Sequence, residues 1–107
     1  MARTAPDYAA VLDNIRRLRN APSAPVEDVE QTLADGYACV LMVEGERLRL
    51  RSRLEQRAAA LGQAPGSSAV GELAALGRGI AHADHRIAEL RAELGGLADR
   101  VRRLRVA

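Results

Sequence analysis

The chain has 107 residues, of which 48% are hydrophobic, yet it contains no Trp, no Phe and only two Tyr. Because aromatic side chains are the bulkiest core fillers, this composition argues against a thick globular core and favours a few long helices lying side by side. The 16 basic residues are all Arg, and a net charge of only +2 excludes a strong overall field. We therefore expect a single all-α domain spanning residues 1–107.

The first expected helix spans residues 7–19. Asp7 follows Pro6, and this pair is typical of a helix start. The apolar residues that follow are spaced so that they form one stripe along one side of a helix. They are Tyr8, Val11, Leu12, Ile15 and Leu18. Arginines crowd the last turn, where cations interact favourably with the helix dipole. The two prolines of the linker, residues 20–25, end the helix.

The second expected helix spans residues 25–61 and has an imperfect heptad repeat. Its apolar heptad positions are Val26, Val29, Leu33, Val40, Val43, Leu50, Leu54 and Leu61, with breaks at Gly36, Arg47 and Arg57. A second apolar set lies on another face of this helix, and we name it the candidate partner interface. It consists of Tyr37, Leu41, Met42 and Leu48. The middle of the helix therefore requires burial on two sides.

Residues 37–51 also allow a different interpretation, a β-hairpin that turns at residues 44–46. The second half of this segment alternates apolar and polar residues, as a strand does. A lone two-stranded sheet between long helices is only marginally stable and leaves its edges unpaired. The helical interpretation is therefore favoured.

The third expected helix spans residues 69–105 and follows a turn at residues 62–68. Its apolar residues alternate in steps of three and four for nearly five heptads, which is the pattern of a coiled-coil seam. The seam consists of Leu73, Leu76, Ile80, Ala83, Ile87, Leu90, Leu94, Leu97, Val101 and Leu104. A short turn makes this helix antiparallel to the second one, so the two form a long helical hairpin.

Alignment of the two long helices about the turn gives a trial register. In this register, the breaks in the heptad of the second helix face residues of the third helix that can accommodate them. The facing pairs are Gly36 with Leu94, Arg47 with Ala83, and Glu46 with Arg86. A glycine accommodates a large neighbour, and an alanine leaves room for an arginine stem.

The short helix 7–19 has two possible positions. It can fold back on the first half of helix 25–61, where the second apolar face lies. This gives a three-helix bundle at one end of the hairpin and a two-helix arm at the turn. Alternatively, it forms a dimer interface together with that face. About 13 residues span roughly 20 Å, which is too short to cover a hairpin roughly 54 Å long. Apolar surface is therefore expected to remain for a partner.

We find no catalytic or cofactor-binding constellation in the sequence. His82 and His85 lie three residues apart, with Glu89 four residues further on. All three lie away from the seam, so we expect a solvated face rather than a metal site. Cys39 is the only cysteine and lies in an apolar run, so it is expected to be a buried small side chain. We expect neither an enzyme nor a cofactor.

The sequence offers no membrane-directed segment. The longest apolar run, residues 37–43, is far shorter than a membrane span. The first ten residues lack the apolar region of a secretory signal. We therefore expect a cytoplasmic protein that does not contact a membrane.

Two groups of arginines fall at the same end of the predicted hairpin and form a candidate polyanion contact. They are Arg16, Arg17, Arg19, Arg100, Arg102, Arg103 and Arg105. Such a cluster can neutralise phosphates. Acidic residues lie at the same end, namely Glu27, Asp28 and Glu30, and no aromatic residue there could stack on bases.

The pattern as a whole resembles bacterial coiled-coil proteins in general and implies no particular family. We expect a non-enzymatic interaction or assembly module that acts through coiled-coil contacts, with itself or with another helical protein as partner. The alternative is a small nucleic-acid-associated protein that uses the arginine-rich end.

Overall fold

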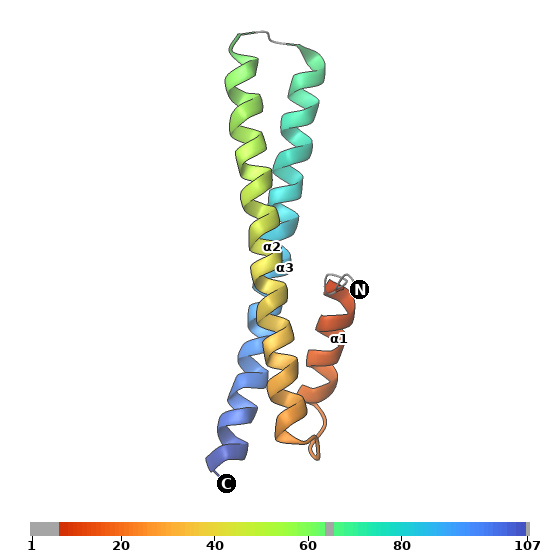
Figure 1. The fold of residues 1–107 in the computed structure, drawn as a ribbon. Coiled ribbons are helices and arrows are strands. Elements are labelled where there is room, and N and C mark those ends of the chain that lie inside the picture. Colours follow the sequence, from red (N-terminus) through yellow and green to blue (C-terminus); the bar gives the residue numbers. More distant parts are fainter. Residues whose placement is uncertain (1–6, 64–65, 107) are drawn as a thin grey trace, which may run out of the picture. The chain divides into compact units, whose positions relative to one another are not determined.

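The computed structural model describes residues 7–63 and 66–106, and these residues form three α-helices and no strand. The helices are α1 (Tyr8–Arg19), α2 (Val26–Leu61) and α3 (Ser67–Val106), with 12, 36 and 40 residues. The expected all-α hairpin with a short N-terminal helix is confirmed (Figure 1). The β-hairpin alternative for residues 37–51 is wrong, because α2 runs through them without a break.

The helix ends follow from local hydrogen bonding. The side chain of Asp7 caps α1 by accepting a hydrogen bond from the backbone N–H of Ala9 at 3.3 Å. The carbonyl oxygen of Pro25 accepts from the N–H groups of Asp28 and Val29, which starts α2. The third helix begins at Ser67, two residues earlier than expected. Residues 64–65 of the predicted turn lie outside the described residues.

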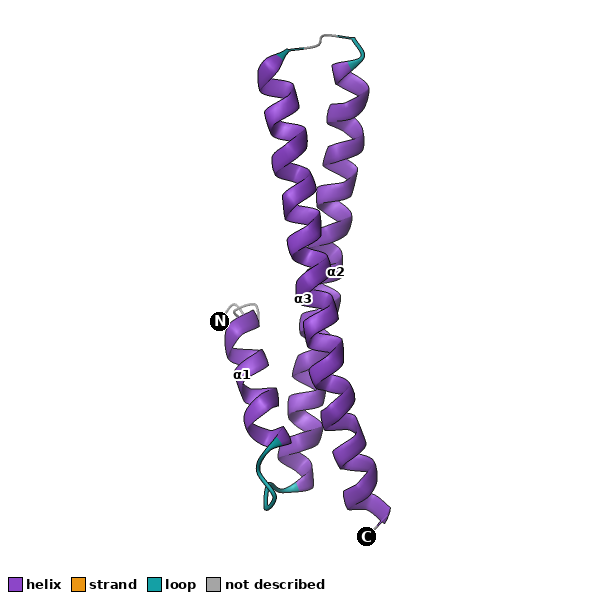
Figure 2. Ribbon diagram, turned by 180° about the vertical axis from the view of Figure 1, so that it is seen from behind, coloured by secondary structure: helices purple, strands orange, loops and turns teal. Residues whose placement is uncertain are grey.

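The chain divides into two compact units, through which α2 and α3 both pass. The three-helix unit comprises Met1–Leu41 and Ala88–Ala107, and the two-helix unit comprises Met42–Ile87. The described part of the three-helix unit holds α1, the first part of α2 and the last part of α3. The two-helix unit holds only the remaining parts of α2 and α3, joined at the turn (Figure 2).

The core of the three-helix unit lies where α1 meets both long helices. Ile15 of α1, Val29 of α2 and Leu90, Leu94 and Leu97 of α3 are almost completely buried. Leu12 and Leu18 flank Ile15 on the same face of α1 and are buried as well. Burial of each such side chain contributes about 1.5–3 kcal/mol, so this stripe supplies most of the attachment of α1.

Gly36 is the point of closest approach in this core. A Cβ atom added at Gly36 would overlap the side chain of Leu94 and would lie 3.1 Å from Cδ1 of Ile15. The predicted pairing of Gly36 with Leu94 is therefore confirmed. The glycine that interrupts the heptad of α2 leaves the space into which Ile15 of α1 and Leu94 of α3 pack.

The two-helix unit has a thinner core. Among its described residues, those buried are Val43 of α2 and Ala83 and Ile87 of α3. Ion pairs join its two helices. Arg47 pairs with Asp84, Glu46 pairs with Arg86 at 3.8 Å, and Arg57 pairs with Glu72 at 3.4 Å. The predicted proximity of Glu46 and Arg86 is thus confirmed, and the Arg47 side chain extends out of the seam to a carboxylate, as an arginine at a seam position must.

We expect Gly36→Ala to lower the free energy of unfolding by about 1 kcal/mol or more, because the added methyl group overpacks a filled core. The matched control is Gly77→Ala. Nothing lies within 4 Å of a Cβ atom at Gly77. The control should therefore gain about 0.5–1 kcal/mol from the higher helix propensity of alanine. Urea unfolding followed by circular dichroism measures both, and equal stabilisation by both substitutions would contradict the packing described for Gly36.

Candidate functional site

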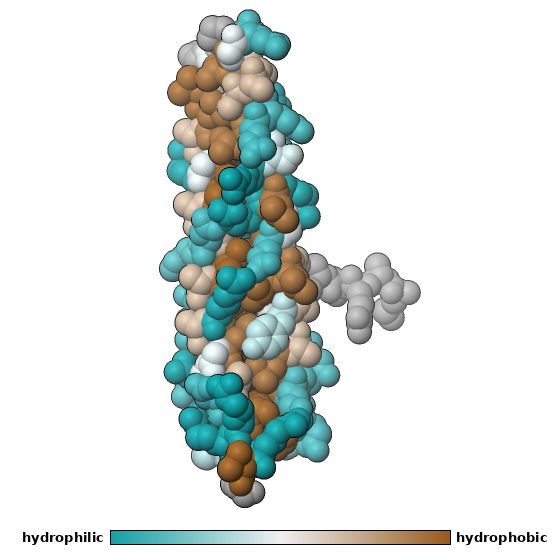
Figure 3. Space-filling view, turned by 90° about the vertical axis from the view of Figure 1, so that its left-hand side faces the viewer, coloured by the Kyte–Doolittle hydropathy of each residue, from teal (hydrophilic) through white to brown (hydrophobic). Residues whose placement is uncertain are grey.

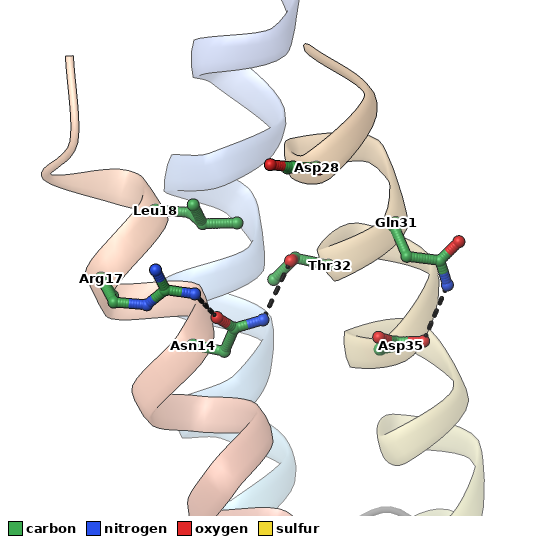
Figure 4. Close-up of a pocket in the computed structure, with 7 residues that line it drawn as sticks. All are labelled: Asn14, Arg17, Leu18, Asp28, Gln31, Thr32 and Asp35. Atoms are coloured by element: carbon green, nitrogen blue, oxygen red, sulfur yellow. Dashed lines mark hydrogen bonds between the residues drawn. The ribbon is translucent and has the colours of Figure 1, made fainter. Parts of the chain in front are cut away.

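A polar groove lies between α1 and α2 in the three-helix unit (Figure 4). Its lining residues are Asn14, Arg17, Leu18, Asp28, Gln31, Thr32 and Asp35. The Asn14 side-chain amide donates to the Thr32 hydroxyl at 3.1 Å and accepts from Arg17. Thr32 is only 4% exposed. A buried hydroxyl needs such a partner, so this bond fixes α1 against α2.

The chemistry of this groove is that of a docking contact. Its remaining hydrogen bond, from Gln31 to Asp35 at 3.1 Å, links two residues one turn apart on α2. The bond between Asn14 and Thr32 therefore orients α1 against α2.

A second polar contact holds α1 against α3. Arg16 pairs with Glu89 at 3.6 Å and with Glu93 at 3.7 Å, and Arg19 pairs with Glu93 at 3.1 Å. The Tyr8 hydroxyl donates to the carboxylate of Glu89. Glu89, which the sequence placed on a solvated face, therefore lies at the α1 contact. The side chain of Glu93 is only 19% exposed, so its pairs are better shielded from solvent than ordinary surface pairs.

The residues of the candidate partner interface are largely exposed. In the three-helix unit, Tyr37 is 50% and Leu41 is 68% exposed, and in the two-helix unit Leu48 is 66% exposed and Met42 is half-buried. Of the two positions considered for the short helix, the structure shows the one folded back on the first part of α2, and this position leaves Tyr37 and Leu41 exposed. Ile15 packs at Gly36 instead, where the small residue allows close approach. Hydrophobic side chains reach the surface among hydrophilic ones on the face drawn in Figure 3.

The seam residues of α3 are all shielded from solvent to some degree. Ala83, Ile87, Leu90, Leu94, Leu97 and Val101 are buried, and Leu73, Leu76, Ile80 and Leu104 are half-buried. The fully buried ones concentrate in the three-helix unit. Along the two-helix unit, the seam is covered by the opposite helix alone.

Most arginines of the candidate polyanion contact have partners within the chain. Besides the pairs of Arg16 and Arg19, the Arg17 side chain bonds to Asn14. Arg102 pairs with Asp99, and Arg105 pairs with Glu30. Arg100 donates a hydrogen bond to the carbonyl oxygen of Arg19. Within the described residues Arg103 is exposed and has no such partner. Four of the seven arginines therefore pair with carboxylates, whereas Arg17 and Arg100 bond to neutral oxygen atoms.

The histidines and the cysteine occupy unlike environments. His82 and His85 are exposed on α3, whereas Cys39 is fully buried in α2. The described residues contain no group of three or more His, Cys, Asp or Glu side chains arranged to hold a metal ion. Across the same residues, no helix is long and apolar enough to cross a membrane.

Three contributions to helix docking escaped the sequence analysis: the Asn14–Thr32 bond, the role of Glu93, and the position of Arg19 over Gly96. A Cβ atom at Gly96 would lie 2.6 Å from Nε of the Arg19 guanidinium. One signal was present in the sequence. Glu89 and Glu93 lie four residues apart on α3, and Arg16 and Arg19 lie three residues apart on α1. Both spacings place charges on one face of a helix.

Comparison with protein-family models, curated proteins and solved structures finds no match for this chain.

We expect Leu90→Asp to abolish cooperative folding, because it buries an unpaired carboxylate at a position that is 0% exposed. His85→Ala should change the melting temperature little, since His85 is exposed. Thermal unfolding followed by circular dichroism checks both substitutions. A loss of several degrees in His85→Ala, or a strong stabilisation of the unsubstituted protein by zinc, would contradict the surface position assigned to the histidine pair.

Proposed function

We propose that this protein is a non-enzymatic, cytoplasmic interaction module that assembles through helix–helix contacts, most simply as a homodimer. The observation that carries the proposal is the exposure of Leu41 and Leu48 on α2, at 68% and 66%. A separation of seven residues places two side chains on the same face of a helix. Burial of each leucine would contribute about 1.5–3 kcal/mol to the free energy of association, which favours the packing of a second helix over them.

The sparse cover of the two-helix unit supports the same proposal. Leu50, Leu54, Leu76 and Ile80 remain half-buried there, although they occupy seam positions. Isolated helical hairpins gain most of their stability from packing rather than from helix propensity. A module of this kind therefore gains stability when further helices pack on it.

The alternative, a nucleic-acid-associated protein, has less support. Four of the seven arginines at the ends of α1 and α3 already pair with carboxylates of the chain, among them Arg19 with Glu93 and Arg105 with Glu30. A site for phosphates requires cations that are not already neutralised. The assembly proposal needs no such assumption.

We expect the protein to self-associate at micromolar concentration in sedimentation equilibrium. Leu48→Glu and Leu41→Glu should each weaken association at least about tenfold, because they bring a charge into the interface. The matched control is Val70→Glu. Val70 is also exposed, at 58%, but lies in the first turns of α3, outside the candidate partner interface.

Two results would contradict this proposal. One is a folded, soluble species of 11.5 kDa at every concentration. The other is salt-dependent binding of duplex DNA that is lost in Arg103→Glu, which would favour the nucleic-acid alternative.

A further inference from the structure

The groove between α2 and α3 is filled by a third helix in one unit and open in the other. In the three-helix unit, where α1 packs on both long helices, the seam residues Leu90, Leu94 and Leu97 are at most 1% exposed. In the two-helix unit, Leu50 and Ile80 are only half-buried at equivalent seam positions. Burial of the leucines and isoleucines of the seam is therefore more complete where a third helix packs on it.

The two-helix unit contains a groove of its own, with both charged and apolar residues in its lining. It is lined by Arg53 and Arg57 from α2 and by Glu72, Ala75 and Leu76 from α3. Ala75 is a small residue and Leu76 is half-buried, so an incoming apolar side chain finds both room and an apolar contact. We refer to these five residues as the hairpin groove.

The charges beside the hairpin groove are not balanced. Arg57 pairs with Glu72 at 3.4 Å, and Arg51 pairs with Glu55 at 3.5 Å along α2. By contrast, no hydrogen bond or ion pair joins Arg49 or Arg53 to another described residue. These two arginines are four residues apart, so they extend from the same face of α2. Arg53, which lines the groove, and Arg49, one turn along the same face of α2, therefore add two uncompensated positive charges on the α2 side.

The attachment of α1 shows which kind of ligand such a groove accepts. α1 inserts an apolar stripe, Leu12, Ile15 and Leu18, and sets a charged edge against opposite charges, with Arg16 and Arg19 meeting Glu93. A ligand for the hairpin groove needs a similar apolar stripe. The edge of the ligand that faces α2 must be acidic, because the unpaired charges on α2 are positive.

We propose that the hairpin groove binds an amphipathic helix of another protein, whose acidic edge faces Arg49 and Arg53. This inference goes beyond the homodimer proposed above, because it uses none of the residues of the candidate partner interface. A second copy of α1 fits poorly, since Arg17, which lies on the α2 side of α1, would meet the like charges of Arg49 and Arg53. Nucleic acid fits poorly, because Glu72 and the apolar Ala75 and Leu76 form the other wall.

The experiment uses two synthetic fluorescent peptides, each about 18 residues long, which is about five helical turns. Both carry leucines at heptad positions. One has glutamates along one edge, and the other has lysines at the same places. Binding to the full chain is followed by fluorescence anisotropy at physiological salt and at protein concentrations below those of self-association.

We expect the acidic peptide to bind at least about tenfold more tightly than the basic one. The double substitution Arg49→Glu with Arg53→Glu should reverse or abolish this preference, and circular dichroism should show that the variant remains helical. The matched control is Arg78→Glu. It removes another exposed arginine without a partner among the described residues, but one that does not line the groove. Its preference should be unchanged.

Three results would overturn the inference: equal binding of the two peptides, no binding of the acidic peptide at any protein concentration below that of self-association, and loss of the preference in Arg78→Glu as well. Binding of duplex DNA to the chain that is lost when Arg49 and Arg53 are substituted would assign this edge to nucleic acid instead. None of these measurements depends on self-association, so the homodimer proposal can fail or succeed separately.

Discussion

The packing of the α3 heptad against α2 is the interaction on which the other features of the structure depend. The seam of α3 is continuous, whereas that of α2 is interrupted at Gly36 and Arg47. Each interruption has a physical consequence. Gly36 creates the space in which Leu94 and Ile15 meet, and Arg47 turns outward to pair with Asp84. The first anchors a third helix. The second leaves a two-helix pair that is held partly by charge.

Polar contacts decide how α1 is seated, and apolar contacts decide how strongly it is held. Leu12, Ile15 and Leu18 supply the burial, but an apolar stripe alone allows a short helix to slide or rotate. The bond between Asn14 and Thr32 and the pairs made by Glu93 have directions, so they select one seating. A buried hydroxyl and a poorly exposed carboxylate are costly unless satisfied, and this cost penalises every other arrangement.

The chain therefore offers surfaces for partners where its own helices do not cover it. Leu41 and Leu48 form an apolar face on α2, and the hairpin groove combines a half-buried seam with uncompensated arginines. These surfaces differ in chemistry. The first is self-complementary, because an apolar face can pack on its own copy. The second carries charge of one sign and so requires an unlike partner.

The sequence by itself determined the helices, the seam and the antiparallel pairing, because heptad spacing, prolines and turn residues act locally or through one repeating pattern. It predicted Gly36 opposite Leu94 and Glu46 beside Arg86, since a register follows once the turn is placed. Only the tertiary structure decided where α1 packs. The sequence pointed to the second apolar face of α2, yet Leu41 on that face stayed exposed. Close approach at Gly36 and hydrogen bonding to Thr32 outweighed hydrophobicity, and both depend on three helices meeting at one point, which no spacing along a single helix records.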